Sequence, residues 1–271
     1  MPATLDEIVA STRRKVAAHK QGTDLWELER RAEMHVPRGF REKLRKTAES
    51  GVAIIAELKK ASPSRGVIRA DFNPQALARE LEAAGAAALS VLTDEEYFQG
   101  SLDNLRIASE SCHLPCLRKD FIVDEFQLLE ARANGADAVL LIAAALSSAE
   151  LIALAKRARE AGLDVLCEAH DELEMVRAFH AGCDLVGVNS RDLKTFKVDL
   201  ETAFRLAPMF EGNIVGVAES GIQTPHDITR LRSAGYKAFL IGESLMKAER
   251  PGEALQSLLR AANDQRRTTV L

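Results

Sequence analysis

The chain has 271 residues, of which 46% are hydrophobic, and its formal net charge at pH 7 is -4. This length and composition allow a large buried core, and the negative charge disfavours nucleic acid as a partner, because binding to a phosphate backbone requires a basic surface. The longest apolar run, residues 138–146, is too short to cross a membrane, and the charged N-terminal stretch does not match a signal peptide. The sequence therefore predicts a cytoplasmic protein with neither nucleic-acid nor membrane partners.

Residues 1–48 differ in pattern from the rest of the chain. Three charged amphipathic stretches, 4–20, 24–34 and 39–49, predict helices in this N-terminal extension. Trp26 is the only tryptophan of the chain, and we expect it to anchor the extension to the remainder of the protein.

From residue 49 onward a pattern recurs, in which a Gly at the end of a helix-like stretch is followed at once by an apolar run. Examples are "NGADAVLLIA" (134–143) and "AGCDLVGVN" (181–189). Gly just past a helix supplies the left-handed conformation that ends it, and the apolar run predicts a buried strand. Eight runs are predicted as strands: 52–58, 87–92, 114–118, 138–143, 164–168, 184–188, 213–218 and 237–241.

These strands predict a closed barrel. Apolar strands that are separated by helices indicate a parallel sheet covered on both faces. Eight strand–helix units fill residues 49–262 without a spare strand, which favours a single-domain α/β fold, a (β/α)8 TIM barrel with a helical N-terminal extension and a solvated tail at 263–271. The alternative, a doubly wound open sheet, would require a Gly-rich dinucleotide loop after the first strand, and "KKASPSRG" (59–66) is not one.

Four cysteines, Cys112, Cys116, Cys167 and Cys183, are too few for a disulfide framework in a chain of this length. Cys112 and Cys116 are four residues apart, but no further Cys or His cluster completes a zinc site. All four are predicted to be reduced structural thiols, and no metal site is expected.

In a TIM barrel the active site lies at the carboxyl ends of the strands. The polar residues predicted there are Glu57, Lys59, Lys119, Glu168, Asn189, Arg191 and Glu219. So many charged and amide groups at one mouth indicate a functional site, because unpaired buried charges are costly. His170 is expected to face the opposite side of its strand from Glu168 and to take no part.

The last two predicted strands end in small turns, "AESGI" (218–222) and "IGESLM" (241–246). TIM barrels frequently bind phosphate with backbone N–H groups of the loops after strands seven and eight. The sequence therefore predicts phosphate binding by the turn residues Ser220, Gly221, Gly242, Glu243 and Ser244. The simpler interpretation is that the glycines only form tight turns.

Five motifs closely resemble the indole-3-glycerol-phosphate synthase family of tryptophan biosynthesis. They are "IAELKKASPSRG" (55–66), "LRKDFIVDEFQ" (117–127), "GVNSRDLKTF" (187–196), "AESGI" (218–222) and "LIGESLM" (240–246). The resemblance implies a carboxy-lyase that acts on a small molecule, 1-(2-carboxyphenylamino)-1-deoxyribulose 5-phosphate, closing a pyrrole ring with loss of carbon dioxide and water. It implies neither a metal nor an organic cofactor.

The resemblance also implies residue roles. Lys119 would be the acid that meets the closing ketone oxygen, and Glu168 would be the general base. Lys59 with Glu57 would supply or steer a second acid, although which lysine serves which step stays open. Further roles are implied for the carboxylate-orienting residues Ser62, Asn189 and Arg191, for Glu219 in the polar network, and for the two turns that hold the phosphate.

Two other functions remain open from the sequence. One is a Schiff-base aldolase that uses Lys119 as its nucleophile, since lysines in barrels serve this chemistry. The other is a non-catalytic barrel that binds phosphosugars and docks a partner through its extension. The oligomeric state also stays open, with a monomer plausible.

Overall fold

The structure is a computed structural model that describes residues 4–192 and 195–269, with side chains described through residue 264. The strands are β1 (Ala53–Leu58), β2 (Ala61–Ser62), β3 (Gly66–Val67), β4 (Ala88–Leu92), β5 (Cys116–Lys119), β6 (Ala138–Ile142), β7 (Asp164–Ala169), β8 (Leu185–Asn189), β9 (Val215–Glu219) and β10 (Ala238–Ile241). The helices of the extension are α1 (Leu5–Gly22), α2 (Leu25–Met34) and α3 (Phe40–Ser50). The later helices are α4 (Pro74–Ala83), α5 (Glu95–Phe98), α6 (Leu102–Ser111), α7 (Phe126–Ala133), α8 (Ser148–Glu160), α9 (Glu172–His180), α10 (Glu201–Leu206), α11 (Pro225–Ala234), α12 (Glu243–Lys247) and α13 (Pro251–Thr269), with 3-10 turns at Ala143–Ala145 and Ala207–Met209.

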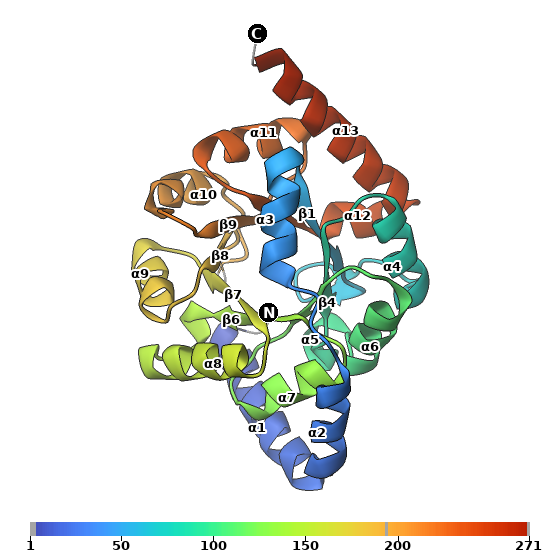
Figure 1. Ribbon diagram of the computed structural model, residues 1–271, viewed down its shortest axis with the longest axis vertical. Helices are drawn as coiled ribbons and strands as arrows, with labels where there is room; N and C mark the ends of the chain where they lie inside the picture. Colours follow the sequence, from blue (N-terminus) through green and yellow to red (C-terminus); the bar gives the residue numbers. More distant parts are fainter. Residues whose placement is uncertain (1–3, 193–194, 270–271) are drawn as a thin grey trace.

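Eight parallel strands close into a barrel, in the order β1-β10-β9-β8-β7-β6-β5-β4, which returns to β1. The predicted (β/α)8 barrel is therefore confirmed, and the helices surround the strands (Figure 1). Glycines that follow helices adopt positive φ, as predicted, at residues 85, 135, 162, 182 and 235. The small antiparallel hairpin of β2 and β3, which follows β1, was not predicted.

The core has two layers. An outer layer packs the strands against the surrounding helices, and it contains residues such as Leu89 and Val139. An inner layer fills the barrel with side chains such as Ile55, Leu117 and Leu140, so the barrel is a packed core and not a pore. All four cysteines are buried with free thiols.

The helix α3 closes the amino-terminal end of the barrel. Phe40 and Leu44 on this helix are fully buried, and they belong to the same cluster as the inner barrel residues. Figure 1 shows α3 lying across the centre of the barrel, while α1 and α2 lie beside α7 at one end of the molecule. The extension therefore packs against the barrel at more than one place.

The prediction that Trp26 anchors the extension is wrong, because this side chain is 70% exposed. The face of α2 that packs against the barrel instead carries Leu28 and Ala32, which cluster with Phe126 and Ala133. Trp26 is two residues before Leu28, and two residues turn a helix by about 200°, so it faces away.

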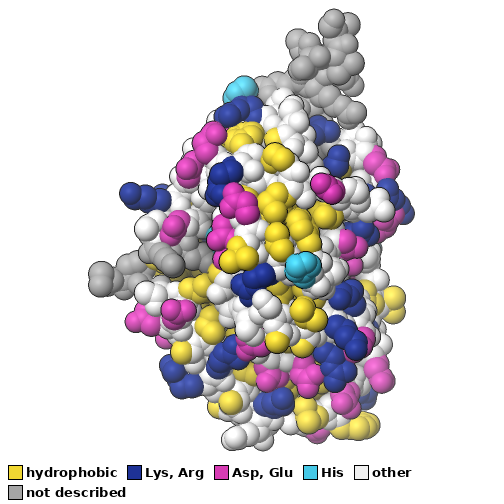
Figure 2. Space-filling model, turned by 90° about the vertical axis from the view of Figure 1, so that its left-hand side faces the viewer, with side chains coloured by type: hydrophobic (Ala, Val, Ile, Leu, Met, Phe, Trp, Pro, Cys, Tyr) yellow, Lys and Arg dark blue, Asp and Glu magenta, His cyan; other side chains and the backbone are white. Residues whose placement is uncertain are grey.

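The C-terminal helix α13 is continuous through Thr269, so a helix occupies most of the stretch where the sequence predicted a frayed tail. Within residues 4–192 and 195–269, no helix combines the length and the apolar character that crossing a membrane requires. Figure 2 shows positive and negative side chains interspersed over one face of the molecule, without a continuous basic stripe on that face.

Candidate active site

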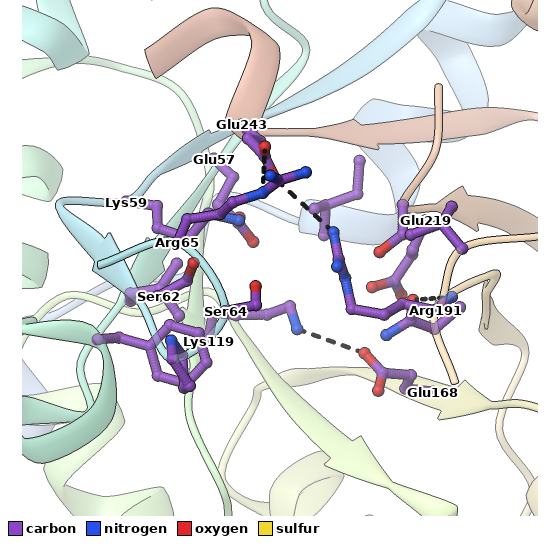
Figure 3. A pocket seen from close by; sticks show the side chains of 18 of the residues that line it. Glu57, Lys59, Ser62, Ser64, Arg65, Lys119, Glu168, Arg191, Glu219 and Glu243 are labelled. Atoms are coloured by element: carbon purple, nitrogen blue, oxygen red, sulfur yellow. Dashed lines mark hydrogen bonds and ion pairs between the residues drawn. The ribbon is translucent and has the colours of Figure 1, made fainter. Parts of the chain in front are cut away.

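A cavity of about 680 Å³ opens at the carboxyl-terminal end of the barrel. Its wall contains every residue that the sequence predicted for the site: Glu57, Lys59, Ser62, Lys119, Glu168, Asn189, Arg191, Glu219, Ser220, Gly221, Gly242, Glu243 and Ser244. Figure 3 shows several of these side chains converging from different strands. The structure thus brings together residues that are far apart in the sequence.

Lys119 and Glu168 form an ion pair in this cavity. Lys119 is the last residue of β5, and its Nζ lies 3.3 Å from Oε2 of Glu168 on β7. Burial by itself would lower the pKa of Lys119, but the carboxyl groups of Glu168, Glu219 and Glu57 outweigh it and raise this pKa above its ordinary value. Lys119 is therefore a cation at neutral pH and carries a proton that it can share with an oxygen on which negative charge develops.

Glu168 and Glu219 are neighbouring buried carboxyl groups with opposite pKa shifts. Burial would raise the pKa of Glu168, but the charges of Lys119 and His170 lower it below its ordinary value. Burial, together with the charge of Glu168, raises the pKa of Glu219 well above its ordinary value. When the pKa values of two carboxyl groups are shifted apart in this way, one group can act as an ionised base while the other stays protonated.

Glu57 and Lys59 form a second ion pair at the end of β1. Lys59 donates from Nζ to Oε1 of Glu57 at 2.5 Å, and both side chains are largely buried. An ideal Cβ on Gly242 would lie only 2.5 Å from this same Oε1. The glycine in the eighth turn is therefore required to make room for Glu57, whatever else the turn binds.

Glu243 lines the cavity and forms ion pairs with three cationic side chains. Its carboxylate lies 3.3 Å from Arg65 Nε, 3.6 Å from Arg191 Nη2 and 2.6 Å from Lys247 Nζ. Figure 3 shows Arg65 and Arg191 approaching it from two sides. A carboxylate cannot itself bind a phosphate, so its side chain serves to hold the guanidinium groups in position, and only its backbone N–H could contact an anion.

The seventh and eighth turns have backbone conformations that suit an anion site. Ser220 and Gly221 both adopt positive φ, 61° and 80°. A Cβ on Gly221 would lie 2.6 Å from Val198, so glycine is needed there for space as well as for conformation. Gly242 precedes the first turn of α12, where backbone N–H groups lack partners within the helix, and Ser244 adds a hydroxyl group.

Asn189 and Ser62 complete the polar wall. Oδ1 of Asn189 accepts the backbone N–H of Arg191 at 3.0 Å, and the Asn189 side chain helps to lower the pKa of Glu168. The hydroxyl oxygen of Ser62 is buried without a hydrogen-bond partner within the described residues. A buried unpartnered hydroxyl group is costly and indicates a position that a ligand or water would satisfy.

A profile of the family described as "Indole-3-glycerol phosphate synthase" matches residues 5–258. A protein of that name from Koribacter versatilis is 58% identical over 96% of this chain and 100% of its own length. One from Laribacter hongkongensis is 47% identical over 95% of this chain and 99% of its own. The chain belongs to the indole-3-glycerol phosphate synthase family. The resemblance carried by the five motifs is thereby confirmed.

Solved structures outside this family share its fold. Thiamine phosphate pyrophosphorylase from Pyrococcus furiosus superposes with a TM-score of 0.59 at 16% identity, covering 79% of this chain and 96% of that one. A structure titled "Native KDPGal structure" gives a TM-score of 0.53 at 19% identity, covering 80% and 95%. At such identities, the similarity shows the barrel fold alone.

In this member of the indole-3-glycerol phosphate synthase family, the cavity also has an apolar wall that was not predicted from the sequence. Leu5 and Ile8 of α1 line it together with Phe98 and Phe121, whose rings lie 6.4 Å apart. The charged residues Arg65 and Lys247 were also missed, although Arg65 stands in the first family motif. The contribution of α1 depends on tertiary docking, for which the local pattern gives no signal.

The prediction for His170 is wrong. Its Nε2 lies 3.5 Å from Oε1 of Glu168, so both side chains are on the same side of the chain at the end of β7. The error is one of strand geometry, because alternation places residues that are two positions apart on the same face.

Proposed function

We propose that the protein is an indole-3-glycerol-phosphate synthase, which converts 1-(2-carboxyphenylamino)-1-deoxyribulose 5-phosphate into indole-3-glycerol phosphate, carbon dioxide and water. The observation that carries this proposal is the buried pair of Lys119 and Glu168, a cationic acid and an ionised base 3.3 Å apart in one cavity of a chain from this family. The cytoplasmic location and the small-molecule substrate that were predicted from the sequence belong to the same proposal.

In the first step, the ring carbon that carries the carboxylate forms a bond with the ketone carbon. The ketone oxygen gains negative charge and takes a proton from the ammonium group of Lys119. A preorganised cation at the place where charge develops lowers the barrier more than it strengthens substrate binding. The ring is left as an iminium, which accepts the electrons of the breaking C–C bond as carbon dioxide leaves. This electron sink belongs to the substrate, so neither a metal nor an organic cofactor is required.

In the second step, the new hydroxyl group leaves and the pyrrole becomes aromatic. Glu168 removes a proton from the carbon next to the ring nitrogen, and an ammonium group donates a proton to the departing hydroxide. Lys59 is the proposed donor, since Glu57 holds its Nζ at 2.5 Å in the wall of the same cavity. Glu219, kept protonated by burial and by Glu168, would hydrogen-bond to the base without competing for the proton.

The remaining residues would hold the two anionic ends of the substrate. Arg191, with Asn189 and the unpartnered hydroxyl group of Ser62, would bind the anthranilate carboxylate, the guanidinium by two parallel hydrogen bonds. The turns around Gly221 and Gly242 would bind the phosphate through backbone N–H groups. Leu5, Ile8 and the phenylalanines would contact the aromatic ring.

The raised pKa of Lys119 favours this function over a Schiff-base aldolase, which needs a neutral amine at the moment of attack. The test is to incubate the purified protein with the carboxyphenylamino substrate and to follow indole fluorescence, with and without EDTA. We expect turnover in both. Absence of turnover with a folded protein, or the trapping of a stable substrate adduct on Lys119 by borohydride, would contradict the proposal.

A further inference from the structure

Beside the site lies a titratable group that the proposed chemistry does not use. His170 follows directly after β7 and is largely buried, with 15% of its side chain exposed. Its two ring nitrogens face two different carboxylates. Nδ1 lies 2.9 Å from Oε2 of Glu174 on α9, and Nε2 lies 3.5 Å from Oε1 of Glu168.

Glu174 is itself fixed in place. The same Oε2 accepts the backbone N–H of His170 at 2.8 Å, and the backbone N–H of Glu174 is capped by Asp171 at 2.8 Å. A carboxylate has no hydrogen to donate and only accepts hydrogen bonds. Because Nδ1 of His170 lies within hydrogen-bond distance of it, Nδ1 must carry the hydrogen. The orientation of the ring is therefore set from the α9 side.

This constraint decides the state of the other nitrogen. Nε2 is buried and makes no hydrogen bond within the described residues. If His170 were neutral, Nε2 would present a lone pair to Oε1 of Glu168, which is repulsive when Glu168 is ionised. With a second proton, the ring is a cation between two carboxylates. Only the cationic form of His170 is therefore compatible with an ionised Glu168.

The surrounding charges support the cationic form. Burial opposes it, but the hydrogen bond that His170 donates to Glu174 and the charge of Glu168 raise the pKa of His170, and Lys119 on β5 acts in the opposite direction. Glu219 on β9 acts on the pKa of Glu168. The two oxygens of Glu168 thus pair with different groups, Oε2 with Lys119 and Oε1 with His170.

We propose that His170, held by Glu174, is a positioning residue that keeps the base Glu168 negatively charged and turned toward Lys119. This inference rests on the proposed function of Glu168 as the general base. His170 does not line the cavity, so it acts through Glu168 and not on the substrate.

The first experiment compares the pH dependence of the single-turnover rate in His170→Asn, Glu174→Gln and the wild type. Loss of a cation 3.5 Å from Glu168 raises the pH at which the base ionises, so the acid limb of the His170→Asn profile moves up by about one pH unit or more. At pH values below the limb, the variant is slower than the wild type by about tenfold for each pH unit by which its limb has moved. At pH values above the limb, the rate of the variant approaches that of the wild type. Glu174→Gln keeps an acceptor for Nδ1 but removes the charge, and its limb moves in the same direction. His180→Asn, at the end of the same helix and away from Glu168, is the matched control and leaves the profile unchanged.

A loss of rate that is uniform over pH in His170→Asn and Glu174→Gln, or an unmoved limb in both, would overturn the inference. The second experiment reads the imidazole directly, by NMR titration of His170 in the wild type and in Glu168→Gln. The coupling is reciprocal, so removal of the Glu168 charge must lower the pKa of His170, and an equal pKa in both proteins would overturn the inference even if His170→Asn fails to fold.

These outcomes separate the two proposals. Near-normal turnover by Glu168→Gln would refute the function proposed for Glu168, whatever His170 does. An inactive Glu168→Gln, combined with an unmoved acid limb in the His170 and Glu174 variants, would leave the function standing and refute only the inference about His170.

Discussion

Asp137 is the residue whose removal we expect to loosen the extension from the barrel. It stands just before β6, and its side chain is fully buried. It accepts hydrogen bonds from the Arg38 side chain at 2.6 Å, from the Arg38 backbone N–H at 2.6 Å and from the Cys116 backbone N–H at 2.7 Å, and His35 lies 3.2 Å away. One carboxylate thus ties the chain between α2 and α3 to two adjoining strands.

The cost of Asp137→Ala can be approximated from these contacts. Removing one partner of a buried ion pair typically costs about 3–5 kcal/mol, because the other charge is left buried and unpaired. The entropy of unfolding is about 2.1 cal/mol/K per residue, which for this chain gives about 0.6 kcal/mol/K. The melting temperature should therefore fall by about 5–8 °C. Asp103→Asn is the control, since Asp103 is an exposed partner of Arg106 and such pairs contribute less than about 1 kcal/mol.

The pH dependence gives an independent check. Burial would raise the pKa of Asp137, but the hydrogen bonds from His35 and Arg38 lower it. A carboxyl group whose pKa is lowered by folding stabilises the fold fully above its unfolded pKa, about 3.9, and this contribution is lost as the pH falls through the folded value. The difference between wild type and Asp137→Ala should thus be largest near neutral pH and shrink below about pH 4. Differential scanning calorimetry at several pH values measures the fall in melting temperature and its pH dependence. A melting temperature of Asp137→Ala within about 1–2 °C of that of Asp103→Asn at pH 7, which is the effect expected for an exposed ion pair, would refute the reasoning.

Three further predictions concern the cavity. Lys119→Ala should lower kcat by about 10²–10⁴-fold with little change in substrate Kd, as expected for a general acid, and near-normal kcat would contradict its role. Gly242→Val should raise KM and lower kcat together, because the new Cβ displaces Glu57 as well as blocking the turn; a variant without kinetic effect would show that the packing argument is wrong. Glu57→Gln and Lys59→Ala should each damage turnover, and the double variant should lose little more, whereas fully multiplicative losses would show that the two residues act separately.

The barrel was predictable because its signals are local. Each apolar run that was predicted as a strand has a strand in it, and the strands differ from their predicted bounds by a few residues at most. The strand predicted at 114–118 is β5, which begins at Cys116 and not at residue 114, since Pro115 has no N–H to donate to a neighbouring strand. The hairpin of β2 and β3 has only two residues per strand, too few to show any periodicity.

The site was predictable to the extent that it depends on strand ends. All carboxyl ends of a parallel barrel meet at one mouth, so Lys119 and Glu168 could be placed together without knowledge of the packing. The contribution of α1 could not be predicted, because it depends on contacts such as that of Ser11 with Glu96, 85 positions apart in the sequence. Trp26 and His170 were misjudged for different reasons, the first by assuming that a large aromatic side chain must be buried and the second by an error of alternation.

The glycines of the barrel connect the fold to its charges. A Cβ on Gly187 would overlap Oε1 of Glu219, just as one on Gly242 would collide with Glu57. Both glycines stand on or next to a strand beside the one that carries the carboxylate. A branched side chain at position 187 would force the carboxyl group of Glu219 out toward solvent, where its raised pKa would return toward the ordinary value. The opposite ionisation of Glu168 and Glu219 therefore depends on the absence of a side chain at glycines of neighbouring strands. These glycines leave the space that buried acidic and basic side chains need at the carboxyl end of the barrel.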